Sequence, residues 1–303
     1  MSSTSSISGN HSHSFSDLTV EKLQGDLEGL GYIADRGLTT SLLLAMKLGR
    51  PILLEGEVGV GKTELAKTVA ALCGRTLIRL QCYEGIDTNQ ALYEWDYARQ
   101  MLQIRSMSGS DASEKSVDDL FGPKFLIERP LLQAIHAGDQ AVLLIDEVDR
   151  ADDEFEAFLL ELLSDFQITI PEIGTVKAAS RPIVILTSNR TRELHDALKR
   201  RCLYNWIGFP DQEQEVAIVQ SRLPGISEHL ATRVVSAVHK LRDMDLEKAP
   251  GVAETIDWVQ SLDTIGATEL SETNVLETLG SVVKGRDDLE FVSNNLSEIV
   301  YGA

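Results

Sequence analysis

The sequence predicts an α/β fold, with a five-stranded parallel sheet between two layers of helices and a smaller helical domain after it. Apolar strand patterns alternate with helical patterns up to about residue 210. A glycine-rich loop joins one of these strands to a helix, and only helical patterns follow residue 210. The chain has 303 residues and is 43% hydrophobic, which is enough for two packed domains.

The glycine-rich loop follows a strand expected at 51–55 and precedes a helix expected at 64–72. It has the pattern G-x-x-x-x-G-K-[ST], in which backbone N–H groups converge on a phosphate at a helix N-terminus. We expect Lys62 to contact the β- and γ-phosphates of ATP and the Thr63 hydroxyl to bind Mg²⁺. A glycine-rich turn without a ligand is the alternative. The predicted nucleotide-binding residues are Gly56, Glu57, Val58, Gly59, Val60, Gly61, Lys62, Thr63 and Glu64.

The next strands are expected at 76–81 and 141–146, and the second of them ends in Asp146 followed by Glu147. Because ligands bind at the carboxyl ends of parallel strands, Asp146 is expected to hold Mg²⁺ beside the phosphate loop. Glu147 is the candidate base that polarises the attacking water. An acidic helix start is the alternative interpretation of this pair.

A fourth strand is expected at 182–188, before Asn189, and a fifth at 203–208. Asn189 can hydrogen-bond the attacking water and the γ-phosphate, although asparagine also favours turns. Between these strands, a helix at 194–201 ends in Arg200 and Arg201. They are candidate arginine fingers for a neighbouring subunit's nucleotide, and cations also complement a helix C-terminus.

Helical patterns at 214–222, 228–243, 253–262 and 270–283 predict a helical domain over residues 211–303. The nucleotide-binding core is expected at 18–210. Residues 1–17 are rich in serine, bury little apolar surface and are expected to form a disordered tail.

Composition limits the classes of partner. The net charge of −19 disfavours a general nucleic-acid binder, and no apolar segment is long enough to span a membrane. The three scattered cysteines are typical of a cytoplasmic protein, in which thiols stay reduced.

Aromatic residues and arginines gather between the second and third strands. This segment can bind single-stranded nucleic acid, grip a polypeptide as a pore loop, or form a small satellite core. Within it, 109–119 is polar and is expected to be a mobile loop. The residues of the cluster are Tyr83, Tyr93, Trp95, Tyr97, Phe121, Arg99 and Arg105.

The order of these motifs resembles that of AAA+ ATPases: phosphate loop, Asp-Glu strand end, Ser-Asn strand end, Arg-Arg helix end and helical lid. Residues 146–151, 158–165 and 167–171 resemble the MoxR branch, which has a helix and then a hairpin in this region. The resemblance to CoxD-type members of that branch is carried by residues 82–85, 93–97, 201–206 and 250–258. Together the resemblance covers the chain from Leu18 onward.

The resemblance implies roles for several residues. Asn189 corresponds to the sensor asparagine, Arg200 and Arg201 to the finger, and Tyr32 and Ile33 to the region that packs on adenine. Plain core packing is the alternative for Tyr32 and Ile33. Related ATPases often carry an arginine early in a lid helix, but residues 251–256 contain none. Arg233 or Lys248 can take its place.

The resemblance also implies a ring, expected to be a hexamer, that hydrolyses ATP to remodel a client metalloenzyme. CoxD-like proteins resemble assembly factors for molybdenum hydroxylases of the carbon monoxide dehydrogenase type, and their usual partner contains a von Willebrand A domain. The alternative is a nucleic-acid motor like the AAA+ subunit of a restriction system, which can use GTP or ATP. The acidic net charge favours the first function.

Overall fold

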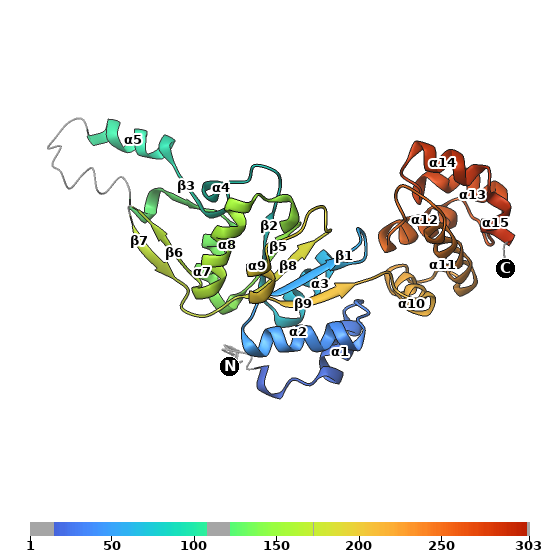
Figure 1. Cartoon of the computed structure of the whole chain (residues 1–303), viewed down its shortest axis with the longest axis horizontal. Helices are drawn as coiled ribbons and strands as arrows, with labels where there is room; N and C mark the ends of the chain where they lie inside the picture. Colours follow the sequence, from blue (N-terminus) through green and yellow to red (C-terminus); the bar gives the residue numbers. More distant parts are fainter. Residues whose placement is uncertain (1–14, 108–121, 172, 302–303) are drawn as a thin grey trace, which may run out of the picture.

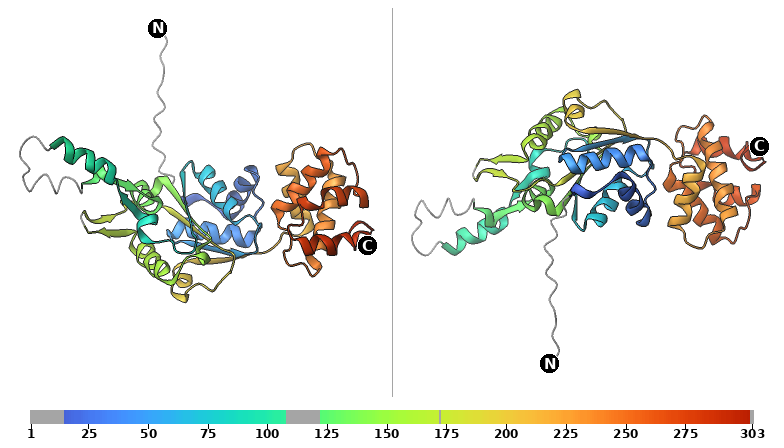
Figure 2. Two further views of the ribbon diagram at one scale, coloured as in Figure 1. Left: turned by 90° about the horizontal axis from the view of Figure 1, so that it is seen from above. Right: turned by 90° about the horizontal axis from the view of Figure 1, so that it is seen from below.

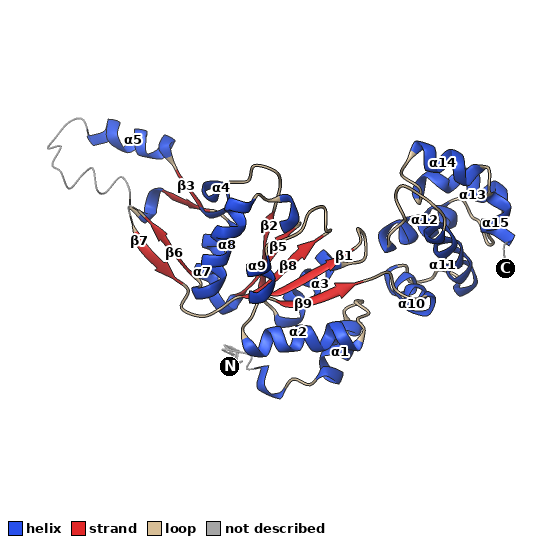
Figure 3. Ribbon diagram, in the orientation of Figure 1, coloured by secondary structure: helices blue, strands red, loops and turns tan. Residues whose placement is uncertain are grey.

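The computed structural model describes residues 15–107, 122–171 and 173–301. They form an α/β core and a helical region that follows the last core strand (Figures 1 and 3). Residues 1–14 of the expected tail lie outside this range. Phe15–Asp17 form a short 3-10 helix, and the Arg75 guanidinium lies 5.1 Å from the centroid of the Phe15 ring. The expectation of disorder up to Asp17 is therefore wrong for these residues, because Phe15 packs on the core.

The central sheet has five parallel strands in the order β2–β5–β8–β1–β9. This confirms the predicted fold class, and each strand begins and ends within one residue of its expected range. This order places the carboxyl end of β8 between those of β5 and β1. The Ser-Asn strand end, the Asp-Glu strand end and the phosphate loop therefore lie at the same edge of the sheet. The strands are β1 (Ile52–Gly56), β2 (Thr76–Gln81), β5 (Ala141–Asp146), β8 (Ile183–Ser188) and β9 (Leu203–Ile207).

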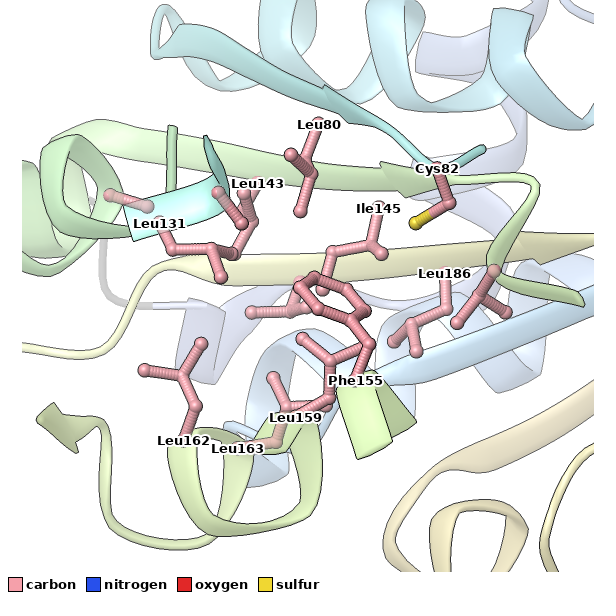
Figure 4. Packing of buried hydrophobic residues seen from close by; sticks show 14 of the residues in the cluster. Leu80, Cys82, Leu131, Leu143, Ile145, Phe155, Leu159, Leu162, Leu163 and Leu186 are labelled. Carbon is pink, nitrogen blue, oxygen red and sulfur yellow. The ribbon is translucent and has the colours of Figure 1, made fainter. Parts of the chain in front are cut away.

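Helices cover both faces of the sheet, which explains why the central strands are continuous apolar segments. On one face, α1 (Val20–Gly29), α2 (Arg36–Leu48) and α3 (Lys62–Cys73) pack on Ile52 and Leu54 of β1. On the other face, Leu53 packs beneath α7 (Pro130–Ala137), α8 (Asp153–Asp165) and α9 (Asp196–Arg201). Figure 4 shows Phe155 of α8 pointing into this second cluster, near Ile145 and Leu186.

Two short antiparallel pairs lie at the end of the core far from the helical region (Figures 1 and 2). β6 (Gln167–Ile170) and β7 (Gly174–Lys177) form the hairpin that the resemblance implied. β3 (Tyr93–Trp95) and β4 (Leu126–Glu128) were not predicted, since three residues are too few to show an alternating pattern. The expected mobile loop at 109–119 lies outside the described residues.

Helices α4 (Thr88–Leu92) and α5 (Tyr97–Met107) flank β3, and α5 projects away from the core (Figure 2). Short 3-10 turns connect several core elements. They are η3 (Pro123–Phe125), η4 (Gly138–Gln140) and η5 (Val148–Arg150).

The helical region packs around Trp258, which is fully buried and donates its indole N–H to Thr278 Oγ1 at 2.8 Å. The helix expected at 270–283 is shorter: α13 ends at Thr278, and a 3-10 turn, η6 (Leu279–Ser281), contains Gly280, a poor helix former. Two later helices were not predicted, α14 and α15. The helices here are α10 (Gln212–Arg222), α11 (Glu228–Asp243), α12 (Val252–Thr264), α13 (Glu272–Thr278), α14 (Arg286–Ser293) and α15 (Leu296–Tyr301).

Candidate nucleotide site

The phosphate loop joins β1 to α3 and begins with a glycine that has no room for a side chain. A Cβ at Gly56 would lie 2.0 Å from the carbonyl oxygen of Ile207, the last residue of the neighbouring strand β9. The loop ends at Gly61, which is the N-cap of α3. The backbone N–H groups in the first turn of α3 have no carbonyl acceptor in a preceding helical turn. They therefore favour an anion at this end of the helix.

Lys62 is the buried cation of this loop, with 6% of its surface exposed. Its Nζ donates to the carbonyl oxygens of Gly56 at 2.7 Å and Glu57 at 2.6 Å. Burial lowers the pKa of Lys62, and the nearby carboxylates, Asp149 foremost, oppose that shift. An ammonium group has three N–H donors, so one remains for a phosphate oxygen. The loop thus fits the phosphates of ATP.

The Thr63 hydroxyl and Asp146 meet directly, although they are 83 residues apart in the sequence. Thr63 Oγ1 lies 3.0 Å from Asp146 Oδ1, and Thr187 Oγ1 donates to the same oxygen at 2.5 Å. Asp146 is 2% exposed and also accepts from Arg79. A hydroxyl and a carboxylate side by side are oxygen ligands of the kind that Mg²⁺ takes beside nucleotide phosphates. The residues therefore fit Mg²⁺.

Glu147 has a left-handed backbone conformation, with φ of 53°, which costs a non-glycine residue about 1–3 kcal/mol. Its N–H donates to Thr187 Oγ1 at 2.9 Å, and its carboxylate lies 3.4 Å from Arg150 Nη1. Asn189 is held from the backbone, since its N–H donates to Asp149 Oδ1 at 3.2 Å. Both side chains line a cavity of about 270 Å³, together with Lys62, Thr63, Asp146 and Thr187. A water molecule between the γ-phosphate of a bound ATP and the Glu147 carboxylate could be polarised in this cavity.

A second cavity, of about 290 Å³, lies between the core and the helical region. Tyr32 and Ile33, which the resemblance assigns to adenine packing, line it on the core side, and Ile256 of α12 lines it on the other side. Tyr32 also belongs to the core cluster, so packing and cavity lining are not exclusive. Burial, with the Asp35 and Glu64 carboxylates, raises the pKa of Tyr32 and keeps its hydroxyl protonated. A largely apolar cavity beside the phosphate loop suits a purine base.

Sequence analysis missed two contacts of the helical region, one with the first turn of α3 and one with the phosphate loop. Arg222 Nη2 of α10 lies 2.5 Å from Glu64 Oε1, and the Val252 N–H of α12 donates to the Gly59 carbonyl at 3.1 Å. Arg222 also lines the second cavity. Arg233 instead donates to the Val300 carbonyl at 2.7 Å, and Lys248 is exposed. Of the described residues, neither of these two lines either cavity.

Arg200 and Arg201 lie exposed in the last turn of α9, and the structure distinguishes them. Arg201 Nε donates to Ser164 Oγ at 2.6 Å, whereas no partner is seen for the Arg200 side chain within the described ranges. Neither arginine lines the cavity around Lys62 and Glu147 in its own chain, which we call the phosphate cavity. Both side chains are exposed, and Arg201 would have to give up its bond to Ser164 to reach a second subunit through Nε.

The aromatic cluster divides into two groups. Tyr93 and Trp95 pack edge to face, with ring centroids 6.0 Å apart, and Trp95 is buried. Tyr83 and Tyr97 are exposed, and Phe121 lies outside the described residues. The satellite-core alternative therefore fits Tyr93 and Trp95 better than a pore loop does.

Comparison with known proteins agrees with this geometry. Residues 51–202, half of the chain, match the family model of the AAA domain, dynein-related subfamily. The chain therefore belongs to this family, and it is an AAA+ ATPase that hydrolyses ATP with Mg²⁺. In the described residues, no helix is both long enough and apolar enough to cross a membrane.

Among its relatives is the gas vesicle ATPase GvpN of Haloferax mediterranei, which is 23% identical over 85% of this chain and 75% of its own length. ClpL of Staphylococcus aureus, an ATP-binding subunit of an ATP-dependent Clp protease, is 32% identical over 46% of this chain and 18% of its own. A RuvB mutant from Thermotoga maritima has a TM-score of 0.50 at 17% identity, covering 93% of this chain and 79% of its own. The RuvB likeness concerns the fold alone.

Proposed function

We propose that this chain is a MoxR-type AAA+ chaperone that uses ATP hydrolysis to remodel a client metalloenzyme during cofactor assembly. The observation that carries the proposal is the nucleotide site at one end of the core. The opposite end of the core carries α5, the β3–β4 pair and the β6–β7 hairpin (Figure 1). Tyr97, Met101 and Leu102 of α5 are exposed, as expected of a surface that contacts another polypeptide.

Within this site we assign Thr63 and Asp146 to Mg²⁺, Lys62 to the phosphates and Glu147 to the attacking water. Asn189 acts as the sensor of the γ-phosphate. Tyr32 and Ile33 pack on adenine. When bound by Thr63 and Asp146, Mg²⁺ would neutralise negative charge on the phosphate oxygens. Arg200 or Arg201 completes the site of a neighbouring subunit in a ring, which we propose to be a hexamer.

The finer assignment is to a CoxD-type factor that acts on a molybdenum hydroxylase of the carbon monoxide dehydrogenase type. It is supported by the motif resemblance described above. We propose a von Willebrand A domain protein as partner and the cytoplasm as location, in keeping with the three free cysteines of the described chain.

Purification of the tagged chain from its native host tests the proposal. We expect a molybdenum hydroxylase and a von Willebrand A protein to copurify, and the hydroxylase to stay inactive when Glu147→Gln replaces the wild-type chain. Stimulation of ATP hydrolysis by DNA, with no such partners, would instead support the nucleic-acid motor.

A further inference from the structure

Arg79 forms an ion pair with the carboxylate that we assign to Mg²⁺. It lies on the edge strand β2, two residues before the strand ends, and its Nε and Nη2 lie 3.0 Å and 2.5 Å from Asp146 Oδ2. The Arg79 side chain is 49% exposed, whereas that of Asp146 is 3% exposed. The Gln81 amide oxygen also accepts from Arg79. The guanidinium thus approaches a buried carboxylate from the solvent side.

Among the described residues, the Asp146 carboxylate accepts hydrogen bonds from the side chains of Thr63, Thr187 and Arg79. Thr187 donates its hydroxyl to Oδ1, and the Thr63 hydroxyl lies within hydrogen-bond distance of both oxygens. Arg79 donates to Oδ2 through Nε and Nη2. A buried carboxylate without a counter-charge is costly, and Arg79 is the cation that pairs with Asp146 in the described part of the chain. A guanidinium suits this task because its planar fork fixes the carboxylate plane.

We infer that Arg79 is a positioning residue of the magnesium site, which holds the Asp146 carboxylate when no metal is bound and weakens Mg²⁺ binding through its positive charge. A fixed cation beside a divalent cation raises the free energy of the bound state. The same cation stabilises the metal-free chain. The inference rests on the assignment of Asp146 to Mg²⁺ and does not depend on the client.

The test is a Mg²⁺ titration of the binding of a fluorescent ATP analogue to Arg79→Met, which keeps much of the aliphatic stem and removes the charge. We expect the Mg²⁺ midpoint to fall by about 3- to 10-fold, as removal of a nearby repulsive charge implies. In EDTA, the melting temperature should fall, because Asp146 loses its counter-charge. Arg36→Met is the matched control, since Arg36 forms an exposed ion pair with Glu21 and should change neither quantity.

Arg79→Lys separates charge from shape. It keeps the cation, so its Mg²⁺ midpoint should stay near that of the wild type. A midpoint in Arg79→Met that is unchanged or higher would overturn the inference, as would an Arg79→Lys variant that behaves like Arg79→Met. Asp146→Asn tests the underlying assignment separately: if that variant binds the analogue with the wild-type Mg²⁺ midpoint, Asp146 does not hold the metal.

Discussion

Asp146 and Glu147 are adjacent in the sequence, but they have different environments. The Asp146 side chain is 3% exposed and accepts hydrogen bonds from Thr63, Thr187 and Arg79. The Glu147 side chain is 32% exposed and faces the phosphate cavity with Arg150 at 3.4 Å as its ion-pair partner. A fixed carboxylate suits a metal ligand, and a freer one suits a group that takes a proton from water.

Glu147→Gln should retain ATP but hydrolyse it at least ~100-fold more slowly, the usual scale for loss of a positioned base. Glutamine keeps the size of the side chain, and the backbone bond to Thr187 does not involve the carboxylate. Single-turnover hydrolysis and equilibrium binding of ATP measure the two effects. Lys62→Ala is the contrasting variant, in which binding itself should weaken. Near wild-type turnover in Glu147→Gln would show that another group polarises the water.

The cysteines give a prediction about pH. Burial raises the pKa of the Cys82 and Cys202 thiols to about 12, from an ordinary value of 9.0. At pH 8 both should resist a thiol reagent in the native chain and react once it is unfolded, while half-buried Cys73 reacts slowly. Because the folded-state pKa is raised, the associated stability is complete below pH 9 and is lost as the pH rises toward 12. Fast native labelling of Cys202 would contradict this placement.

At the scale of elements, the segment between β2 and β5 contains a packed strand, β3, and an exposed helix, α5. Tyr93 and Trp95 of β3 pack against each other, and Trp95 is buried. Tyr97 and Met101 of α5 are exposed. The packed pair Tyr93 and Trp95 therefore stabilises the start of this segment, and contacts with a client are expected on α5.

The combined change of Tyr93 and Trp95 to alanine should lower stability by about 3–5 kcal/mol, as for other large aromatic deletions. Thermal unfolding measures the loss. Replacing Tyr97 and Met101 by alanine is the matched comparison, which should spare the melting temperature and basal ATPase but reduce stimulation by a client. An unaltered melting temperature after loss of Tyr93 and Trp95, with lost client activation, would restore the pore-loop interpretation for β3.

The start of α12 gives a prediction about the lid. A Cβ at Gly251 would lie 2.8 Å from both Gly59 Cα and the Val58 carbonyl oxygen, so Gly251→Ala must push α12 away from the phosphate loop. We expect ATP affinity to fall by about 10-fold, equivalent to ~1.4 kcal/mol. Gly280→Ala is the control in the same region, since no atom lies within 4 Å of its Cβ position. Equal affinities in the two variants would show that this contact is not needed.

At the scale of the whole molecule, the nucleotide site and the two candidate finger arginines lie in different places on the chain. Arg200 and Arg201 do not line the phosphate cavity of their own chain among the residues described. AAA+ proteins generally form ring oligomers, and in a ring these arginines would meet a neighbour's nucleotide. Assembly and hydrolysis should therefore depend on each other, with nucleotide stabilising the ring by mass action.

Mixing Arg200→Ala, Arg201→Ala chains with Lys62→Ala chains should restore part of the hydrolysis that each lacks, because an intact site can then face an intact finger. A trans arginine contributes about 10³-fold or more to turnover in comparable enzymes. ATPase assays on mixed rings, confirmed by mass measurement, test this expectation, and the single variants identify the finger. Mixed rings without recovered activity would argue against trans action.

The sequence alone predicted the sheet, and it named most of the residues that line the candidate nucleotide site. The apolar strands, the glycine-rich loop and the Asp-Glu and Ser-Asn strand ends are local patterns, and the parallel-sheet rule brings strand ends to one edge. Short strands such as β3 and β4 escaped prediction because they contain too few residues to show a period.

Only the tertiary structure decided which distant residues meet. Arg79 looks like an ordinary strand residue, and its pairing with Asp146 depends on the register of β2 against β5. Arg222 reaches Glu64 only because the helical region lies against the phosphate loop. Likewise, burial of Trp95 and exposure of Tyr97 follow from packing and not from composition. Such contacts join residues that are far apart in the sequence, and hydrophobic periodicity shows only which residues share a face of one element. The contacts are therefore determined by how the elements pack in three dimensions.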